Sequence, residues 1–240
     1  MENSPDRGEK TGPPPAQPPP VDPAEFLAAL RADLNAPLPG RAAHARMAPR
    51  PQVGPPRAED PRADARQGAV LALFYLHKGR LWLPFILRAT YNGVHSGQIS
   101  FPGGGLEPHD DNLIETALRE THEEIGVPPA SIQVLGELSP IYIAPSNFLV
   151  QPVIGFTSDR PTFHLDPYEV AELMEVELAD LLNPRNQRQE VRPLRDERLA
   201  DVPYFAIHER AIWGATAMIL AELTALPALR PLRNAAQQAQ

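Results

Sequence analysis

The sequence reads GGGLEPHDDNLIETALRETHEEIGV over residues 103–127, with one arginine and no lysine among its acidic side chains. Apolar residues recur at helical spacing between residues 112 and 126, which predicts a helix after a glycine-rich turn. The face expected to meet a core carries Ile114, Ala117, Leu118, Thr121 and Ile125, and the opposite face carries Thr116, Arg119, Glu120, Glu123 and Glu124. Asp110, Asp111 or Asn112 can serve as the N-cap, and Gly126 ends the helix.

Three glutamates converge on the polar face, because Glu120, Glu123 and Glu124 stand at positions i, i+3 and i+4. Like charges at this spacing destabilise a helix by roughly 0.2–0.5 kcal/mol per pair. A solvated acidic face is the preferred interpretation of the three glutamates taken alone. A divalent cation would make their arrangement favourable, and oxygen ligands favour Mg²⁺ or Mn²⁺ over Zn²⁺. The glycines upstream, which let a backbone approach a ligand, favour the metal.

The stretch from Gly105 to Val127 resembles the Nudix box, which is Gly, five residues, Glu, seven residues, then Arg-Glu-aliphatic-any-Glu-Glu-any-Gly-aliphatic. The residues in register are Arg119, Glu120, Glu123, Glu124, Gly126 and Val127. Two positions depart from the box, since Asp111 replaces its first glutamate and Thr121 replaces an aliphatic residue. The resemblance implies a Nudix-type α/β/α sandwich with a mixed β-sheet.

The segment LRATYNGVHSGQISFPGG, residues 87–104, is similar to the coenzyme A diphosphatase branch of the Nudix superfamily. Further segments that look like this branch are LPGRAAHARMAP at 38–49, IAPSNFLVQPVIGF at 143–156 and IWGATAMIL at 212–220. The similarity covers most of residues 23–226. This chain has Gly93 where the branch often has Arg, and Ile86 where it often has Thr.

The resemblance implies roles for residues inside the box. Glu120 and Glu124 would bind Mg²⁺ or Mn²⁺, with Glu123 and the Gly105 carbonyl as further ligands. Arg119 would orient the glutamates, and the catalytic residues would be Arg119, Glu120 and Glu123. The general base stays open between Glu120 and a loop residue outside the box, for which the weaker candidates are Glu169 and Glu172.

The resemblance also implies a substrate. Arg88, His95 and Gln98 are candidate phosphate contacts, with an ordinary structural role as the alternative for each. We expect hydrolysis of coenzyme A or acyl-CoA to 4'-phosphopantetheine, or its acyl form, and adenosine 3',5'-bisphosphate. The alternatives are another nucleoside diphosphate derivative, such as ADP-ribose or a dinucleoside polyphosphate, and a non-catalytic Nudix binding module.

Composition limits the partners. The net charge of −8 from 30 acidic and 22 basic residues, without a Lys/Arg stripe, argues against nucleic acid and against an anionic membrane surface. No cysteine occurs, which excludes disulfides and thiol catalysis. We expect a cytoplasmic protein, because the N-terminus lacks the apolar region of a signal peptide. A homodimer stays open.

The chain divides into four predicted regions. Half of its 30 prolines fall within residues 1–61, and residues 1–22 are expected to form a disordered Pro-rich tail, with a polyproline II ligand for a partner domain as the less favoured alternative. A short helix capped by Asp22 and an irregular linker, residues 23–67, would dock on the domain. The Nudix domain would span 68–230, followed by a flexible tail at 231–240. Within the domain we expect a β-hairpin from residue 68, a strand after the acidic helix, strands up to residue 213 and a closing helix that stops near Pro227.

Overall fold

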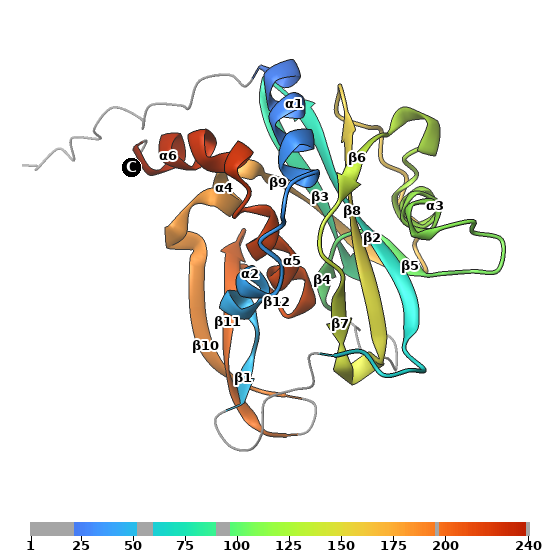
Figure 1. The fold of residues 1–240 in the computed structure, drawn as a ribbon, viewed down its shortest axis with the longest axis vertical. Coiled ribbons are helices and arrows are strands. Elements are labelled where there is room, and N and C mark those ends of the chain that lie inside the picture. The colour runs from blue at the N-terminus through green and yellow to red at the C-terminus, as the bar shows by residue number, and fades with distance from the viewer. Residues whose placement is uncertain (1–21, 52–59, 90–96, 195–196, 239–240) are drawn as a thin grey trace, which may run out of the picture.

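The computed structural model describes residues 22–51, 60–89, 97–194 and 197–238, and its centre is an eight-stranded mixed sheet (Figure 1). The strands run in the order β4-β3-β2-β8-β6, with β5 on β2, β7 on β8 and β9 on β3. Their bounds are β2 Arg66–His77, β3 Arg80–Arg88, β4 Ile99–Ser100, β5 Gly103–Gly105, β6 Gln133–Glu137, β7 Ile141–Ile143, β8 Phe148–Thr157 and β9 Val170–Glu177. The mixed sheet predicted from the resemblance is confirmed.

Strand β2 organises this sheet. It pairs in parallel with β8 and antiparallel with β3 and β5. The β2–β3 hairpin predicted from the sequence turns at Lys78 and Gly79, whose φ angles of 50° and 74° are those of a type I′ turn. Residues 69–75 are buried on both faces apart from the half-buried Val70, because helices cover the sheet on both sides.

Alternate residues of β2 enter two separate cores. Ala69, Leu71 and Leu73 pack with helix α3 (Leu113–Ile125), whereas Ala72 and Phe74 pack on the opposite face. That opposite face is covered by α1 (Pro23–Leu34) and α5 (Ala215–Leu223). Figure 1 shows α3 on one side of the large sheet and α1, α2 and α5 on the other. The predicted α/β/α sandwich is therefore the observed architecture.

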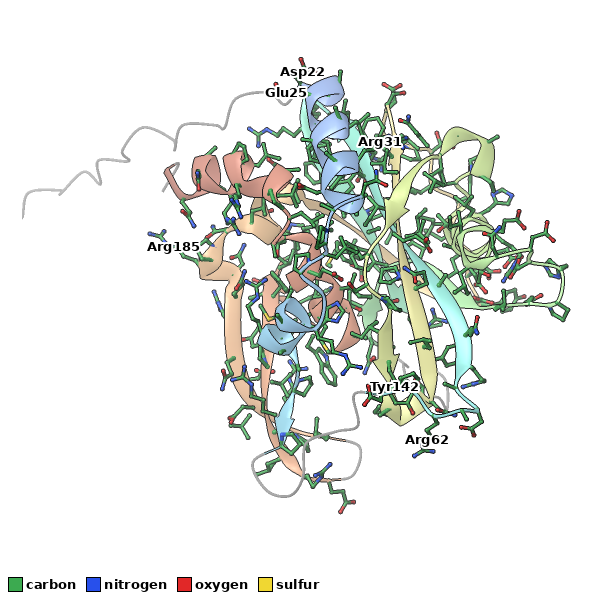
Figure 2. All side chains as sticks on the ribbon, in the orientation of Figure 1. Asp22, Glu25, Arg31, Arg62, Tyr142 and Arg185 are labelled. Atoms are coloured by element: carbon green, nitrogen blue, oxygen red, sulfur yellow. The ribbon has the colours of Figure 1, made fainter. Side chains whose placement is uncertain are left out.

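Helix α1 forms and docks as predicted. The Asp22 carboxylate accepts hydrogen bonds from the backbone N–H groups of Ala24 and Glu25, which caps the helix near the point where the described chain begins (Figure 2). The Phe26 ring meets Phe74 of β2 edge to face, with centroids 5.6 Å apart. Arg31, labelled in Figure 2, donates to the carbonyl of Val134 next to it, in β6.

A second, four-stranded sheet lies beyond α2 and α5. It contains β1 (Arg50–Pro51), β10 (Gln187–Pro193), β11 (Leu199–Ile207) and β12 (Arg210–Trp213). The sequence predicts strand structure in the region of β11 and β12 but none at β10, because the segment QRQEVRP has no apolar alternation. Helix α5 touches β7 of the large sheet and both β11 and β12 of the small one, so it joins the two sheets.

Two helices form in segments where the sequence predicts an irregular linker and a tail. Residues 40–47, expected to be irregular, form α2 (Gly40–Met47), which starts after Pro39 and has no proline inside. Its His44 is buried, and Nε2 of His44 lies 2.9 Å from a carboxylate oxygen of Glu222 in α5. After the predicted stop at Pro227 the chain continues as α6 (Arg230–Gln238), so α5 does not close the fold. Of the tail predicted at residues 1–22, residues 1–21 lie outside the described residues.

The remaining elements are short. Helix α4 spans Leu178–Leu182, and 3-10 turns occur at Pro129–Ser131, Ala144–Ser146, Pro184–Asn186 and Pro227–Leu229. In the described part of the chain no single helix has the length and apolar character needed to cross a membrane, and one bent pair, Ala215–Leu223 with Pro227–Gln237, passes on length and composition alone.

Candidate active site

Strand β5 lies beneath α3, and its glycines allow side chains of the helix to approach the strand backbone closely. Gly103, Gly104 and Gly105 pair with β2. A Cβ added at Gly104 would lie 2.3 Å from Oε1 of Glu120, so the Glu120 carboxylate rests directly on the strand backbone. Glycine at 104 therefore creates the space that this carboxylate occupies.

The two ends of α3 are fixed by local hydrogen bonds. The Asn112 side chain accepts from the backbone N–H groups of Ile114 and Glu115, which decides the N-cap left open by the sequence. Gly126 ends the helix with φ 75°, the left-handed conformation of a C-terminal glycine. A Cβ at Gly126 would lie 2.7 Å from the His164 Cβ, so glycine also admits the chain that passes this end of the helix.

That passing chain, residues 163–169, carries Glu169 to the helix. The backbone N–H of His164 donates to the Ile125 carbonyl at 2.9 Å, and the N–H of Asp166 donates to the Glu124 carbonyl at 3.0 Å. Both carbonyls belong to the last turn of α3 and would otherwise have no partner within the helix. These bonds place Glu169 opposite the glutamates of the helix.

Three carboxylates meet at this point. One oxygen from each of Glu120, Glu124 and Glu169 lies within 4.8 Å of the others. Ligand oxygens on opposite sides of Mg²⁺, at its usual bond length of about 2.1 Å, are roughly 4.2 Å apart, so small side-chain rotations would let all three bind one ion. The donor set, carboxylate oxygen throughout, suits a hard divalent cation. The residues present fit a metal site.

Glu124 is the buried member of the cluster. Its side chain has no solvent exposure, Oε1 accepts from Arg88 Nη1 at 3.0 Å, and Oε2 accepts from the Gly103 N–H at 2.8 Å. Burial raises the pKa of Glu124 to about 7, although Arg88 and the Gly103 N–H act in the opposite direction. Burial likewise raises the pKa of Glu120, and Arg119 opposes that rise. A further positive charge at this point would favour the ionised form of both glutamates.

Arg119 holds the exposed side of the cluster in place. Its Nη1 donates to Glu120 at 3.1 Å and to Glu123 at 2.7 Å, and its Nη2 donates to the Gly105 carbonyl at 3.0 Å. Asp110 binds the same guanidinium in a bidentate manner, through Nε at 2.9 Å and Nη2 at 3.0 Å. The paired charges raise the pKa of Arg119 and lower that of Asp110.

The acid that supports Arg119 is Asp110, whereas the sequence register of the box points to Asp111. The Asp110 side chain is 3% exposed, while Asp111 is exposed and its backbone N–H donates to Glu115. The signal in the sequence was the pair of adjacent aspartates just before the N-cap, because either can reach back to the helix. Register within the box alone selects the wrong one.

The structure brings together only part of the predicted site. Glu123 is 54% exposed and bound to Arg119, outside the three-carboxylate cluster. Arg88 lies against Glu124 rather than standing alone at a strand end. The Gln98 carbonyl accepts from the Arg88 N–H at 3.1 Å, and His95 lies outside the described residues.

The two loop candidates for a general base separate clearly. Glu169 joins the cluster, whereas Glu172 bonds to Arg210 of the small sheet at 2.5 Å. Both residues stand in one polar segment, so the sequence alone carried no means of choosing between them.

A cavity of about 580 Å³ opens beside the cluster, with Glu120 in its wall. Its other lining residues are Arg66, Gln67, Gly105, Leu106, Glu107 and Phe148. This volume falls within the range of about 300–1,000 Å³ that is usual for small-molecule sites. The cavity therefore adjoins the carboxylate cluster through Glu120.

Comparison with known proteins identifies the family of this chain. Residues 65–197 match the NUDIX domain. A protein of Yersinia enterocolitica described as uncharacterized Nudix hydrolase NudL is 40% identical over 137 residues, which cover 57% of this chain and 69% of that protein. A protein of the same description from Pectobacterium atrosepticum is 33% identical over 181 residues, covering 75% of this chain and 92% of the relative. The crystal structure of RenU, a Nudix hydrolase from M. smegmatis, covers 76% of this chain and 95% of its own, with 17% identity and a TM-score of 0.46. The chain belongs to the Nudix family and is a Nudix hydrolase.

Proposed function

We propose that this hydrolase cleaves the diphosphate linkage of coenzyme A or acyl-CoA with Mg²⁺ or Mn²⁺, releasing 4'-phosphopantetheine, or its acyl form, and adenosine 3',5'-bisphosphate. The observation that carries the proposal is the cluster of Glu120, Glu124 and Glu169 at the wall of a ligand-sized cavity. The choice of coenzyme A rests on the similarity of residues 87–104 to the coenzyme A diphosphatase branch.

The metal-binding role belongs to Glu120 and Glu124, and Glu169 lies beside them. A divalent cation held there would neutralise phosphoryl oxygens and lower the pKa of a bound water. Glu124 is held rigid by Arg88 and the Gly103 N–H, and Glu120 is oriented by Arg119. Glu169 is the exposed carboxylate of the three, so it is the group we assign to accept the proton of the attacking water.

Two positions, Ile86 and Gly93, depart from the pattern of the coenzyme A diphosphatase branch. Ile86 is fully buried in the core beneath α3, so the replacement of Thr by Ile there lies away from any substrate. Gly93 lies outside the described residues, and the Arg that the branch often has there is missing. Arg88, which pairs with Glu124, is retained.

The test is product release by the full chain. Coenzyme A, ADP-ribose and a dinucleoside polyphosphate are incubated separately with Mg²⁺, with Mn²⁺ and with a chelator, and the products are separated by ion-exchange chromatography and identified by mass. The same assay is run on Glu124→Gln and on Glu172→Gln, which changes a carboxylate outside the cluster.

We expect metal-dependent release of adenosine 3',5'-bisphosphate from coenzyme A that Glu124→Gln abolishes and Glu172→Gln preserves. Turnover of ADP-ribose or of the dinucleoside polyphosphate alone would replace coenzyme A as the substrate. Silence on all three substrates would favour a non-catalytic binding module.

A further inference from the structure

The cavity beside Glu120 contains an arginine whose position differs from those of the two arginines at the carboxylates. Arg66 and Phe148 are direct neighbours across the parallel pair of β2 and β8. The Arg66 guanidinium carbon lies 4.2 Å from the centroid of the Phe148 ring, so the cation lies over the aromatic face. Its Nη2 donates to the Ser146 carbonyl at 3.3 Å.

Arg66 makes no ion pair with any residue that the structure describes, whereas Arg88 and Arg119 are both bound to carboxylates. Neither acid in the cavity wall forms an ion pair with Arg66: Glu120 bonds to Arg119, and an oxygen of the half-exposed Glu107 lies 3.5 Å from His109 Nδ1. The guanidinium of Arg66 is therefore a positive charge at the cavity with no ion-pair partner among the described side chains. A cation so held is suited to an anionic group on a ligand.

The position of this cation separates it from the carboxylate cluster. Ala69 of β2 pairs with Gly104, the residue against which the Glu120 carboxylate lies, and Arg66 stands three residues before Ala69. At about 3.3 Å per residue, Arg66 and the strand position beneath Glu120 are roughly 10 Å apart along β2. The Phe148 ring that supports Arg66 fits against Gly68, where an added Cβ would lie 3.0 Å from its Cε1.

We infer that Arg66 binds a phosphomonoester carried by the nucleoside of the substrate, apart from the diphosphate that is cleaved. This inference rests on the proposed function, because adenosine 3',5'-bisphosphate as a product means that the substrate carries such a group on its ribose. A phosphomonoester has a charge of about −1.5 to −2 at neutral pH and three acceptor oxygens, which match the planar donors of a guanidinium. Arg66 is thereby a specificity-determining residue that favours coenzyme A over its analogue without the 3'-phosphate.

The experiment compares coenzyme A with dephospho-coenzyme A as substrates of the full chain. The variants are Arg66→Gln, Arg66→Lys and the control Arg62→Gln, which removes one positive charge four residues away without touching the cavity wall. Figure 2 labels Arg62 at the end of the large sheet near Tyr142. Product inhibition by adenosine 3',5'-bisphosphate and by AMP is measured for each variant, because it reports binding without requiring turnover.

We expect Arg66→Gln to lower kcat/KM for coenzyme A by about 10- to 100-fold, the loss of one charge-assisted contact, mainly through KM. For dephospho-coenzyme A, kcat/KM should change by less than about twofold. Inhibition by adenosine 3',5'-bisphosphate should weaken, while inhibition by AMP stays the same. Arg66→Lys should recover part of the loss, and Arg62→Gln should match the wild type.

An equal loss for both substrates would overturn the inference while leaving the proposed hydrolysis intact, since Arg66 would then act on a group that the two share. Unchanged kinetics for Arg66→Gln would overturn it as well. A wild-type enzyme that turns over neither coenzyme A nor dephospho-coenzyme A would overturn the proposed substrate and, with it, this role for Arg66.

Discussion

Arg88 Nη1 lies 3.0 Å from Oε1 of Glu124, and this ion pair connects the end of β3 to a carboxylate with no solvent exposure. Arg88 lowers the pKa of Glu124 against the larger effect of burial. The arginine therefore helps to keep the buried carboxylate in the charged form that a metal requires.

Replacing Arg88 by Gln should impair metal binding without removing any carboxylate. Without the guanidinium the pKa of Glu124 should rise above 7, so half-maximal Mn²⁺ binding should move to higher pH. Loss of one partner from a buried pair should also destabilise the fold at pH 8, by up to about 3–5 kcal/mol. Arg80→Gln, which breaks the Arg80–Glu177 pair at 2.9 Å, is the matched control. An unchanged pH midpoint in Arg88→Gln would contradict the role assigned to the pair.

The raised pKa of Glu124 has a consequence for stability in the absence of metal. Between the ordinary value of 4.5 and its value of about 7, the folded protein binds more protons at this group than the unfolded chain does. Stability should therefore fall as pH rises through this window and then level off, by up to about 3 kcal/mol from this group. Asp110, whose pKa is lowered, stays ionised throughout and does not offset the fall.

Urea denaturation at pH 5, 6, 7 and 8, with a chelator and with saturating Mg²⁺, measures this effect. Mg²⁺ should remove most of the fall, because its binding compensates the ionised carboxylate. If the stability of the metal-free protein rose steadily from pH 5 to pH 8, burial would not raise the pKa of Glu124.

The neighbouring aspartates should respond differently to the same substitution. Asp110→Asn removes the bidentate partner of Arg119 and should lower kcat/KM by about 10-fold or more, with a loss of roughly 1–3 kcal/mol in stability. Asp111→Asn should stay within about twofold of the wild type, because Asp111 is exposed and does not bond to Arg119. A larger loss of kcat/KM for Asp111→Asn than for Asp110→Asn in a steady-state assay would show that Asp111, the position selected by the register of the box, is the acid that supports Arg119.

Glu169 and Glu172 form a second matched pair. Glu169→Gln should reduce kcat by about 100-fold or more, the usual contribution of a positioned proton acceptor. Glu172→Gln only breaks a surface pair with Arg210 and should leave kcat within about threefold. Equal activity of the two variants in single-turnover measurements would contradict the role of Glu169 as the proton acceptor.

The sequence predicts the parts of this site that depend on local spacing. Helical periodicity places Glu120 and Glu124 together, Gly126 marks the end of the helix, and the turn at Lys78 and Gly79 marks the hairpin. Periodicity also assigned Glu124 to the polar face, yet the side chain is fully buried, because β5 and Arg88 cover that part of the helix.

Features that depend on contacts between distant segments were not predictable. Glu169 reaches the cluster because residues 164 and 166 bond to the last carbonyls of α3, and no local pattern encodes that meeting. Helix α2 lies in a proline-rich segment and is stabilised by the contact of His44 with Glu222, 178 residues further along the chain. Strand β10 has polar residues on both faces and depends on its pairing with β11.

The most informative measurement is a Mn²⁺ titration followed by electron paramagnetic resonance, on the wild type, Glu120→Gln, Glu124→Gln and the control Glu172→Gln at pH 8. We expect a tight site in the wild type and in Glu172→Gln that is weakened at least about 10-fold in Glu120→Gln and in Glu124→Gln. Equal Mn²⁺ binding by all four proteins would contradict a metal site at Glu120 and Glu124.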